Sequence, residues 1–76
     1  IQVLGHTDNR PIRTVQFPSN WHLSQEGAHS TMQLLMKMGV PGNRIHAEGR
    51  ADAEPIASND TPDGRARNRR VEIMVD

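Results

Sequence analysis

Short apolar runs bounded by glycine or polar residues occur at three places along the chain and indicate β-strands. They predict strands over residues 1–5, 45–49 and 71–75. Gly5 closes the first strand. The last strand places three β-branched side chains on one face, those of Val71, Ile73 and Val75.

Apolar residues recur at helical spacing between the first two strands. Asn20 is a suitable N-cap, so we expect a helix that begins at Trp21 and ends at residues 39–42 (GVPG). Gly27 is anomalous in this helix, because an interior glycine costs about 1 kcal/mol relative to alanine. The apolar face contains Ala28, Met32, Leu35 and Gly39, with Leu34 and Met38 widening it.

A second helix is predicted after a loop over residues 50–60. Thr61 supplies the N-cap, Pro62 suits the first helical position, and the helix reaches about Arg69. The order strand, helix, strand, helix, strand predicts an α+β sandwich in which helices cover one side of a single sheet.

Composition indicates a lean core and no general affinity for polyanions. Of 76 residues, 34% are hydrophobic and 3% aromatic, with no cysteine. Such a core stabilises a fold by roughly 3–5 kcal/mol, so we expect a fragment of a larger domain. Nine basic and nine acidic side chains cancel, which argues against a nucleic-acid or anionic-membrane binder. Any targeting or transmembrane segment would lie upstream of these residues.

Catalytic and metal-binding patterns are missing from the sequence. Ser24 and Ser30 lack a nucleophile elbow, and no phosphate-binding or dinucleotide-binding glycine motif occurs. We therefore expect no enzymatic activity, no cofactor and no metal. The four histidines do not have the spacing of metal ligands, and we interpret them as scattered surface residues: His6, His22, His29 and His46.

Two charged features could bind a ligand. Asp8 follows the end of a strand, where it could contact a ligand or cap its own turn. The dense run of arginines from residue 65 to 70 could form a salt-bridged helix face, with Arg65 and Arg69 stacked at i, i+4. Alternatively, one guanidinium of this run, that of Arg69, faces a ligand carboxylate.

Three segments together resemble the OmpA-like C-terminal domain, in the right order and over essentially the whole chain. They are residues 5–9 (GHTDN), 20–24 (NWHLS) and 64–73 (GRARNRRVEI). The resemblance implies a βαβαβ two-layer sandwich with helices on one mixed sheet, present here as a single domain over residues 1–76. The family's first strand and helix would be missing, and the edge left unpaired would invite a second chain, so a homodimer is among the expected partners.

The resemblance also implies a ligand site for the diaminopimelate of peptidoglycan. The Thr-Asp pair falls on Thr7 and Asp8, of which Asp8 would meet the diaminopimelate ammonium. Asn20 and Arg69 would line the same cleft. The family's other anchor, the arginine of a Leu-Ser-x-x-Arg-Ala motif, is replaced by Gly27. Either a nearby arginine (Arg10, Arg13 or Arg69) substitutes, or this domain binds the wall weakly and docks partner proteins instead.

Residues 11–19 (PIRTVQFPS) are similar to two inner-membrane subsets of the family. These are the TssL component of type VI secretion systems and the MotB-like flagellar stator proteins. Residues 17–25 and 48–52 favour the secretion subset. The resemblance thus implies a periplasmic domain of an inner-membrane protein that anchors a secretion complex to peptidoglycan, with other membrane subunits of that complex as partners.

Overall fold

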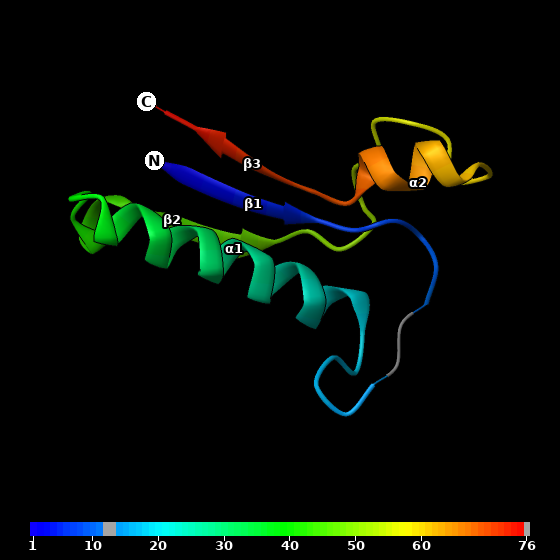
Figure 1. The fold of residues 1–76 in the computed structure, drawn as a ribbon, viewed down its shortest axis with the longest axis horizontal. Coiled ribbons are helices and arrows are strands. Elements are labelled where there is room, and N and C mark those ends of the chain that lie inside the picture. The colour runs from blue at the N-terminus through cyan, green and yellow to red at the C-terminus, as the bar shows by residue number, and fades with distance from the viewer. Residues whose placement is uncertain (12–13, 76) are drawn as a thin grey trace.

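The computed structural model describes residues 1–11 and 14–75, which form one three-stranded sheet with two helices. Figure 1 shows α1 lying along the sheet and α2 beyond the end at which β3 begins. The α+β class and the element order predicted from sequence are confirmed. The elements are β1 (Gln2–His6), α1 (Asn20–Lys37), the 3₁₀ turn η1 (Gly42–Arg44), β2 (His46–Gly49), α2 (Pro62–Asn68) and β3 (Arg70–Met74).

The sheet is mixed, in the order β2-β1-β3. β1 runs parallel to β2 and antiparallel to β3. α1 packs against β1 and β2, and two glycines allow the close approach. A Cβ at Gly5 would collide with the carbonyl of Ser24, and one at Gly49 would lie 2.6 Å from the backbone nitrogen of Gln25. A larger residue at either position would push the helix off the sheet.

The core is small and lies between α1 and the first two strands. Val3, Ala28 and Ile45 are buried, which confirms the apolar face of α1 at its centre. Leu34 and Met38, expected to widen that face, are 59% and 74% exposed, so this part of the prediction is wrong. They are exposed because α1 touches β3 only marginally and no described element covers that side of it.

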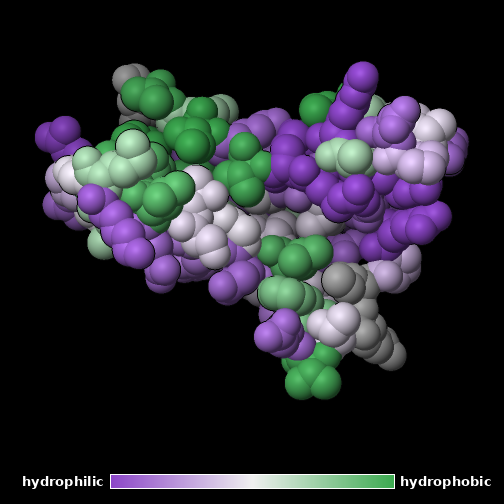
Figure 2. Space-filling model, in the orientation of Figure 1, coloured by the Kyte–Doolittle hydropathy of each residue, from purple (hydrophilic) through white to green (hydrophobic). Residues whose placement is uncertain are grey.

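The α1 side of β3 is uncovered. Val71 and Ile73 pair with Gly5 and Val3, so they share the face on which α1 lies, yet Ile73 is 49% exposed. Figure 2 shows hydrophobic side chains gathered toward the end of the molecule that carries the two termini, whereas the α2 end is hydrophilic. We name this uncovered apolar surface the β3 face; it comprises Val71, Ile73 and Val75.

The N-cap of α1 is Ser19, so the prediction of Asn20 is wrong. Ser19 has an extended backbone, and its Oγ accepts a hydrogen bond from the backbone N–H of His22 at 3.4 Å. The cap of α2 is as predicted, because the Thr61 hydroxyl accepts from Gly64 and proline occupies the first turn. Neither helix of the described residues has the length and apolar character that a bilayer crossing requires.

Candidate ligand-binding site

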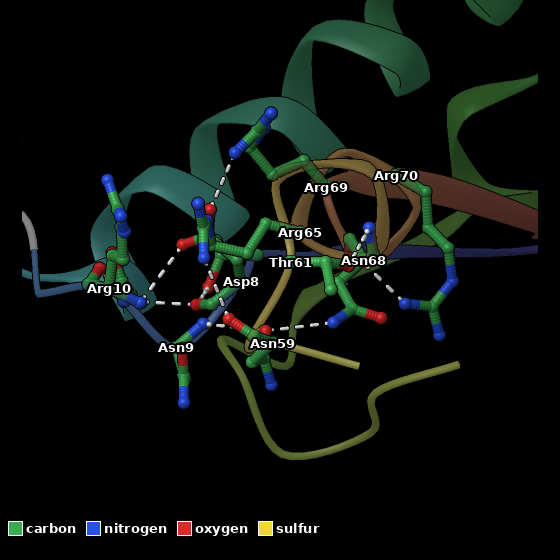
Figure 3. A network of polar contacts seen from close by, with 12 residues as sticks. Asp8, Asn9, Arg10, Asn59, Thr61, Arg65, Asn68, Arg69 and Arg70 are labelled. Carbon is green, nitrogen blue, oxygen red and sulfur yellow. Dashed lines mark hydrogen bonds and ion pairs between the residues drawn. The ribbon is translucent and has the colours of Figure 1, made fainter. Parts of the chain in front are cut away.

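Asp8 lies just past the end of β1, with a side chain only 10% exposed. Its Oδ2 accepts a hydrogen bond from Nη1 of Arg69 at 2.6 Å, and its Oδ1 accepts one from the backbone N–H of Arg10 at 3.1 Å. Asp8 therefore caps its own turn, as one of its two interpretations held, and it also pairs with the guanidinium of Arg69 (Figure 3). This is the ion pair on which the site is built. Contact of Asp8 with a ligand stays a prediction.

Thr7 orients Asp8 through the backbone. Its N–H donates to the carbonyl of Ala51 at 2.8 Å, and its hydroxyl donates to the carbonyl of Asp8 at 2.8 Å. Ala51 has a φ of 51°, in the left-handed region that few residues other than glycine adopt. The Ala51 N–H donates to Oγ of the buried Ser24 at 3.1 Å, so the loop after β2 is fixed to α1 and to the Asp8 turn.

Asn20 fastens the start of α1 to the same turn. Its Nδ2 donates to the carbonyl of Arg10 at 2.8 Å and to the carbonyl of Asp8 at 3.3 Å. The amide thus positions the loop that carries Asp8. Asn20 was expected to line the cleft, and in the structure it lies beside the site as a support of the Asp8 turn, while Ser19 caps the helix.

Arg69 lies on the edge of a groove of about 380 Å³ next to the ion pair. Its side chain is 54% exposed, so the guanidinium can be reached from solvent. Thr7, Leu23, Gly27 and Val71 also line this groove. A Cβ at Gly27 would lie 3.7 Å from Cγ2 of Val71, an ordinary contact, so the position has room for a side chain. Four of the five predicted site positions therefore meet around one groove or its ion pair, with Asn20 bracing them.

The arginine run does not form the salt-bridged helix face. α2 ends at Asn68, and Arg69 turns away with a ψ of 91° to reach Asp8. Arg65 instead donates to the carbonyl of Asn59 at 3.0 Å. The pairing of Arg65 with Arg69 along one helix is therefore wrong, because the helix is one residue too short to carry both.

Arg70 and Glu72 form a second ion pair on the side of the sheet away from α1. Nε of Arg70 lies 2.7 Å from Oε2 of Glu72, and its hydrogen bond and charge lower the pKa of Glu72 below its ordinary value. Nη2 of Arg70 also donates to the carbonyl of Glu54 at 2.9 Å. This pair borders His6, which is buried, so the interpretation of all four histidines as surface residues is wrong for His6.

Asn68 is the residue that the sequence analysis missed. It is fully buried, and its Oδ1 accepts from the backbone N–H groups of Ile56 and Ala57 at 2.9 and 3.0 Å. Its Nδ2 donates to the carbonyl of Ala57 at 3.1 Å and to Oδ1 of Asn59 at 2.8 Å. The side chain of Asn59 also accepts from the N–H of Asn9, which adjoins Asp8 (Figure 3). Asn68 therefore holds the loop that supports the Asp8 turn.

The site is suited to binding two opposite charges. The largely buried Asp8 carboxylate lies in contact with the guanidinium of Arg69, whose side chain is 54% exposed and lines a mainly apolar groove. The described residues contain no group of three or more His, Cys, Asp or Glu side chains placed to hold a metal ion. A zwitterionic ligand would give Asp8 an ammonium in place of the Arg69 guanidinium, and would give Arg69 a carboxylate in place of that of Asp8.

Comparisons with known proteins agree on one family. The profile of the OmpA family matches residues 1–69. The chain is 43% identical over 76 residues to Motility protein B of Bacillus subtilis, covering 99% of the chain and 29% of that protein. It is 41% identical over 75 residues to the Peptidoglycan-binding protein ArfA of Mycobacterium tuberculosis, covering 99% of the chain and 22% of that protein.

A solved structure with the same fold carries a more specific description. The cell wall anchor of the type VI secretion system of Pseudomonas aeruginosa superimposes with a TM-score of 0.83 and 54% identity, covering 92% of this chain and 50% of that one. The chain spans less than a third of these curated relatives and half of this solved chain. These matches confirm the resemblance predicted from sequence, and identity is higher to the secretion anchor than to the motility protein.

Proposed function

Because the chain belongs to the OmpA family, we propose that it is a non-enzymatic module that binds peptidoglycan and anchors an envelope complex to the cell wall. The names of the relatives support this role, since one is a cell wall anchor and another a peptidoglycan-binding protein. The contact between Asp8 and Arg69 carries the proposal, because it sets a carboxylate beside an exposed guanidinium that lines the groove.

The ligand is the free amino-acid end of diaminopimelate in the stem peptide. Its ammonium binds Asp8, and its carboxylate binds Arg69. A hydrogen bond to a charged group contributes roughly 1.5–3 kcal/mol, so two such contacts account for a specific though moderate affinity. The hydrocarbon part of diaminopimelate then lies in the groove, against Leu23 and Val71.

Arg69 takes the place of the arginine that the family carries where this chain has Gly27. Gly27 on α1 and Arg69 just before β3 line the same groove. The guanidinium of Arg69 can therefore bind a ligand carboxylate that the family binds with an arginine on α1. Of the other two arginines considered, Arg10 contacts Asp8 through its backbone N–H, and Arg13 lies outside the described residues.

In this proposal the full protein is a component of a type VI secretion system, and this domain lies in the periplasm. A segment outside these residues holds the protein in the inner membrane, and other membrane subunits of the complex are its partners. The 54% identity to the Pseudomonas aeruginosa anchor favours this role over a flagellar stator, which the 43% identity to Motility protein B supports as the second candidate. The third candidate, a degenerate module that docks proteins, rests on Gly27.

We further propose that these residues are the later part of a larger domain whose first strand and helix are missing. The uncovered β3 face supports this proposal, because Ile73 and Val75 are 49% and 77% exposed on the side where a helix would pack. β3 is also an edge strand of the described sheet, and its unpaired side would support pairing with a second copy.

Co-sedimentation with purified peptidoglycan sacculi tests the proposed function. The unmodified chain is expected to pellet with sacculi, whereas Asp8→Ala should stay in solution. Asp52→Ala is the matched control, since Asp52 is an exposed carboxylate on the loop after β2. Pelleting of Asp8→Ala to the same extent as Asp52→Ala would exclude this site as the wall-binding one.

A further inference from the structure

Trp21 is an aromatic side chain that is half exposed. It is the only tryptophan of the chain and the second residue of α1, and it is 51% exposed. Its ring packs edge-on against that of His22, with centroids 5.2 Å apart and planes at 85°. Nδ1 of His22 lies 2.7 Å from Oγ of Ser19, and the carbonyl of Trp21 accepts from Oγ of Ser24 at 2.8 Å. Hydrogen bonds thus fix the Trp21 backbone and the imidazole that contacts the indole, and about half of the Trp21 surface is exposed to solvent.

Trp21 belongs to the start of α1, which lies at the same end of the sheet as the Asp8–Arg69 site. Trp21 follows Asn20, whose amide bonds the carbonyls of Asp8 and Arg10. One turn later Ser24 contacts the loop after β2, whose Ala51 in turn accepts from Thr7. The start of α1 thus borders the carboxyl ends of the parallel strands β1 and β2, where ligands of such sheets bind.

We infer that Trp21 is a stacking surface for a sugar ring of the peptidoglycan glycan strand; this inference rests on the proposed function and extends its site. A pyranose has one apolar C–H face and a rim of hydroxyl groups. The exposed indole offers an apolar face of matching size, and its neighbours Asn20 and His22 are polar side chains able to hydrogen-bond.

The length of the ligand agrees with this placement. A stem peptide held at Asp8 by its third residue extends by about 3.3–3.6 Å per residue toward the sugar that carries it. Trp21 directly follows Asn20, whose own amide contacts the Asp8 turn, so the stem residues between diaminopimelate and the sugar have only Asn20 to pass. Diaminopimelate and the sugar can therefore bind at the same time, one on each side of Asn20.

The test compares two ligands that differ only in the sugars. Calorimetric titrations use the tripeptide L-alanyl-γ-D-glutamyl-meso-diaminopimelate and the same tripeptide carried on its N-acetylglucosaminyl-N-acetylmuramyl disaccharide. Because Trp21 is the one tryptophan, its fluorescence reports contact directly. We expect the disaccharide ligand to bind at least tenfold more tightly and to change the fluorescence, whereas the bare tripeptide leaves the fluorescence nearly unchanged.

Three variants locate the effect. Trp21→Ala is expected to bind both ligands with the tripeptide's affinity, and Trp21→Phe to keep part of the gain. Met38→Ala, an exposed apolar residue at the other end of α1, should retain the whole gain. Equal affinity of the unmodified chain for the two ligands, without a fluorescence change at saturation, would overturn this inference alone. Absence of binding by either ligand would overturn the proposed function and the inference with it.

Discussion

The guanidinium of Arg69 lies 2.6 Å from the carboxylate of Asp8, although 61 positions separate the two residues in the chain. β1 and β3 pair antiparallel, so the C-terminal end of β1 lies beside the N-terminal end of β3. Each residue lies just outside its strand, where the backbone is free to turn. The charge pair is thus a product of the sheet topology, and neither residue has the other among its sequence neighbours.

Substitutions at Gly27 test whether Arg69 supplies the guanidinium that binds the ligand carboxylate or whether that guanidinium is missing. Gly27→Ala and Gly27→Arg should each add up to about 1 kcal/mol to the free energy of unfolding, because they replace a glycine in a helix interior. If Arg69 already serves the ligand carboxylate, Gly27→Arg should bind the tripeptide no more tightly than Gly27→Ala. The measurement is calorimetric titration of the three proteins alongside denaturant unfolding. A tenfold gain for Gly27→Arg, about 1.4 kcal/mol, would show instead that the missing arginine limits binding.

Asn68 should be a major determinant of stability. Asn68→Ala removes four hydrogen bonds and leaves the N–H groups of Ile56 and Ala57 without their acceptor, which should cost about 2–4 kcal/mol. Arg67→Ala, an exposed change in the same helix, is the control and should stay within about 0.5 kcal/mol. Denaturant unfolding monitored by circular dichroism measures both. An equal effect of the two substitutions would contradict the role assigned to Asn68.

The isolated 76-residue chain should be marginally stable. Its core rests on Val3, Ala28 and Ile45, and the β3 face is uncovered. We therefore expect a free energy of unfolding below about 5 kcal/mol, the lower end for complete domains. Equilibrium urea unfolding combined with analytical ultracentrifugation checks this expectation. A cooperative monomer well above that value would contradict the proposal that a strand and a helix are missing.

Acid should weaken the fold partly through Glu72. Arg70 lowers the pKa of Glu72 in the folded state, so the ion pair adds stability above the unfolded pKa of about 4.3. This contribution is lost as the pH falls through the depressed folded value. The pair is partly exposed and screened by salt, so the effect should be modest. Urea midpoints at about pH 6 and about pH 3 should differ less in Glu72→Gln than in the unmodified chain. An unchanged difference would show that the pair adds nothing.

The elements of the fold could be predicted because each has a local signal. Thr61 followed by Pro62 fixed the start of α2, and periodicity located α1. The cap of α1 was misassigned because Ser19 and Asn20 are equally good N-caps by type, and the choice depends on a contact of Asn20 with the Asp8 turn. Local patterns carry no information on such a contact.

Most residues of the candidate site could be predicted from the sequence, but the contacts between them could not. Asp8 was identified by its place after a strand and by the family resemblance. Its ion pair with Arg69 was not predicted, because Arg69 was expected to stack on Arg65 or to face a ligand carboxylate. The contact depends on where α2 ends, and a helix boundary shifts easily by one residue. Asn68 escaped notice because a neutral amide between arginines has no charge, spacing or periodicity to single it out.

The most direct test of the central claim, that Asp8 and Arg69 together bind the zwitterionic end of diaminopimelate, is a calorimetric titration with two tripeptides. One ends in meso-diaminopimelate, and the other has L-lysine in its place. Lysine keeps the side-chain ammonium and lacks the side-chain carboxylate, while both peptides keep the C-terminal carboxylate. We predict at least tenfold tighter binding of the diaminopimelate peptide, with Arg69→Ala abolishing that preference and Asp8→Ala abolishing binding of both. Equal affinity of the unmodified chain for the two peptides, or a preference that survives Arg69→Ala, would contradict the account.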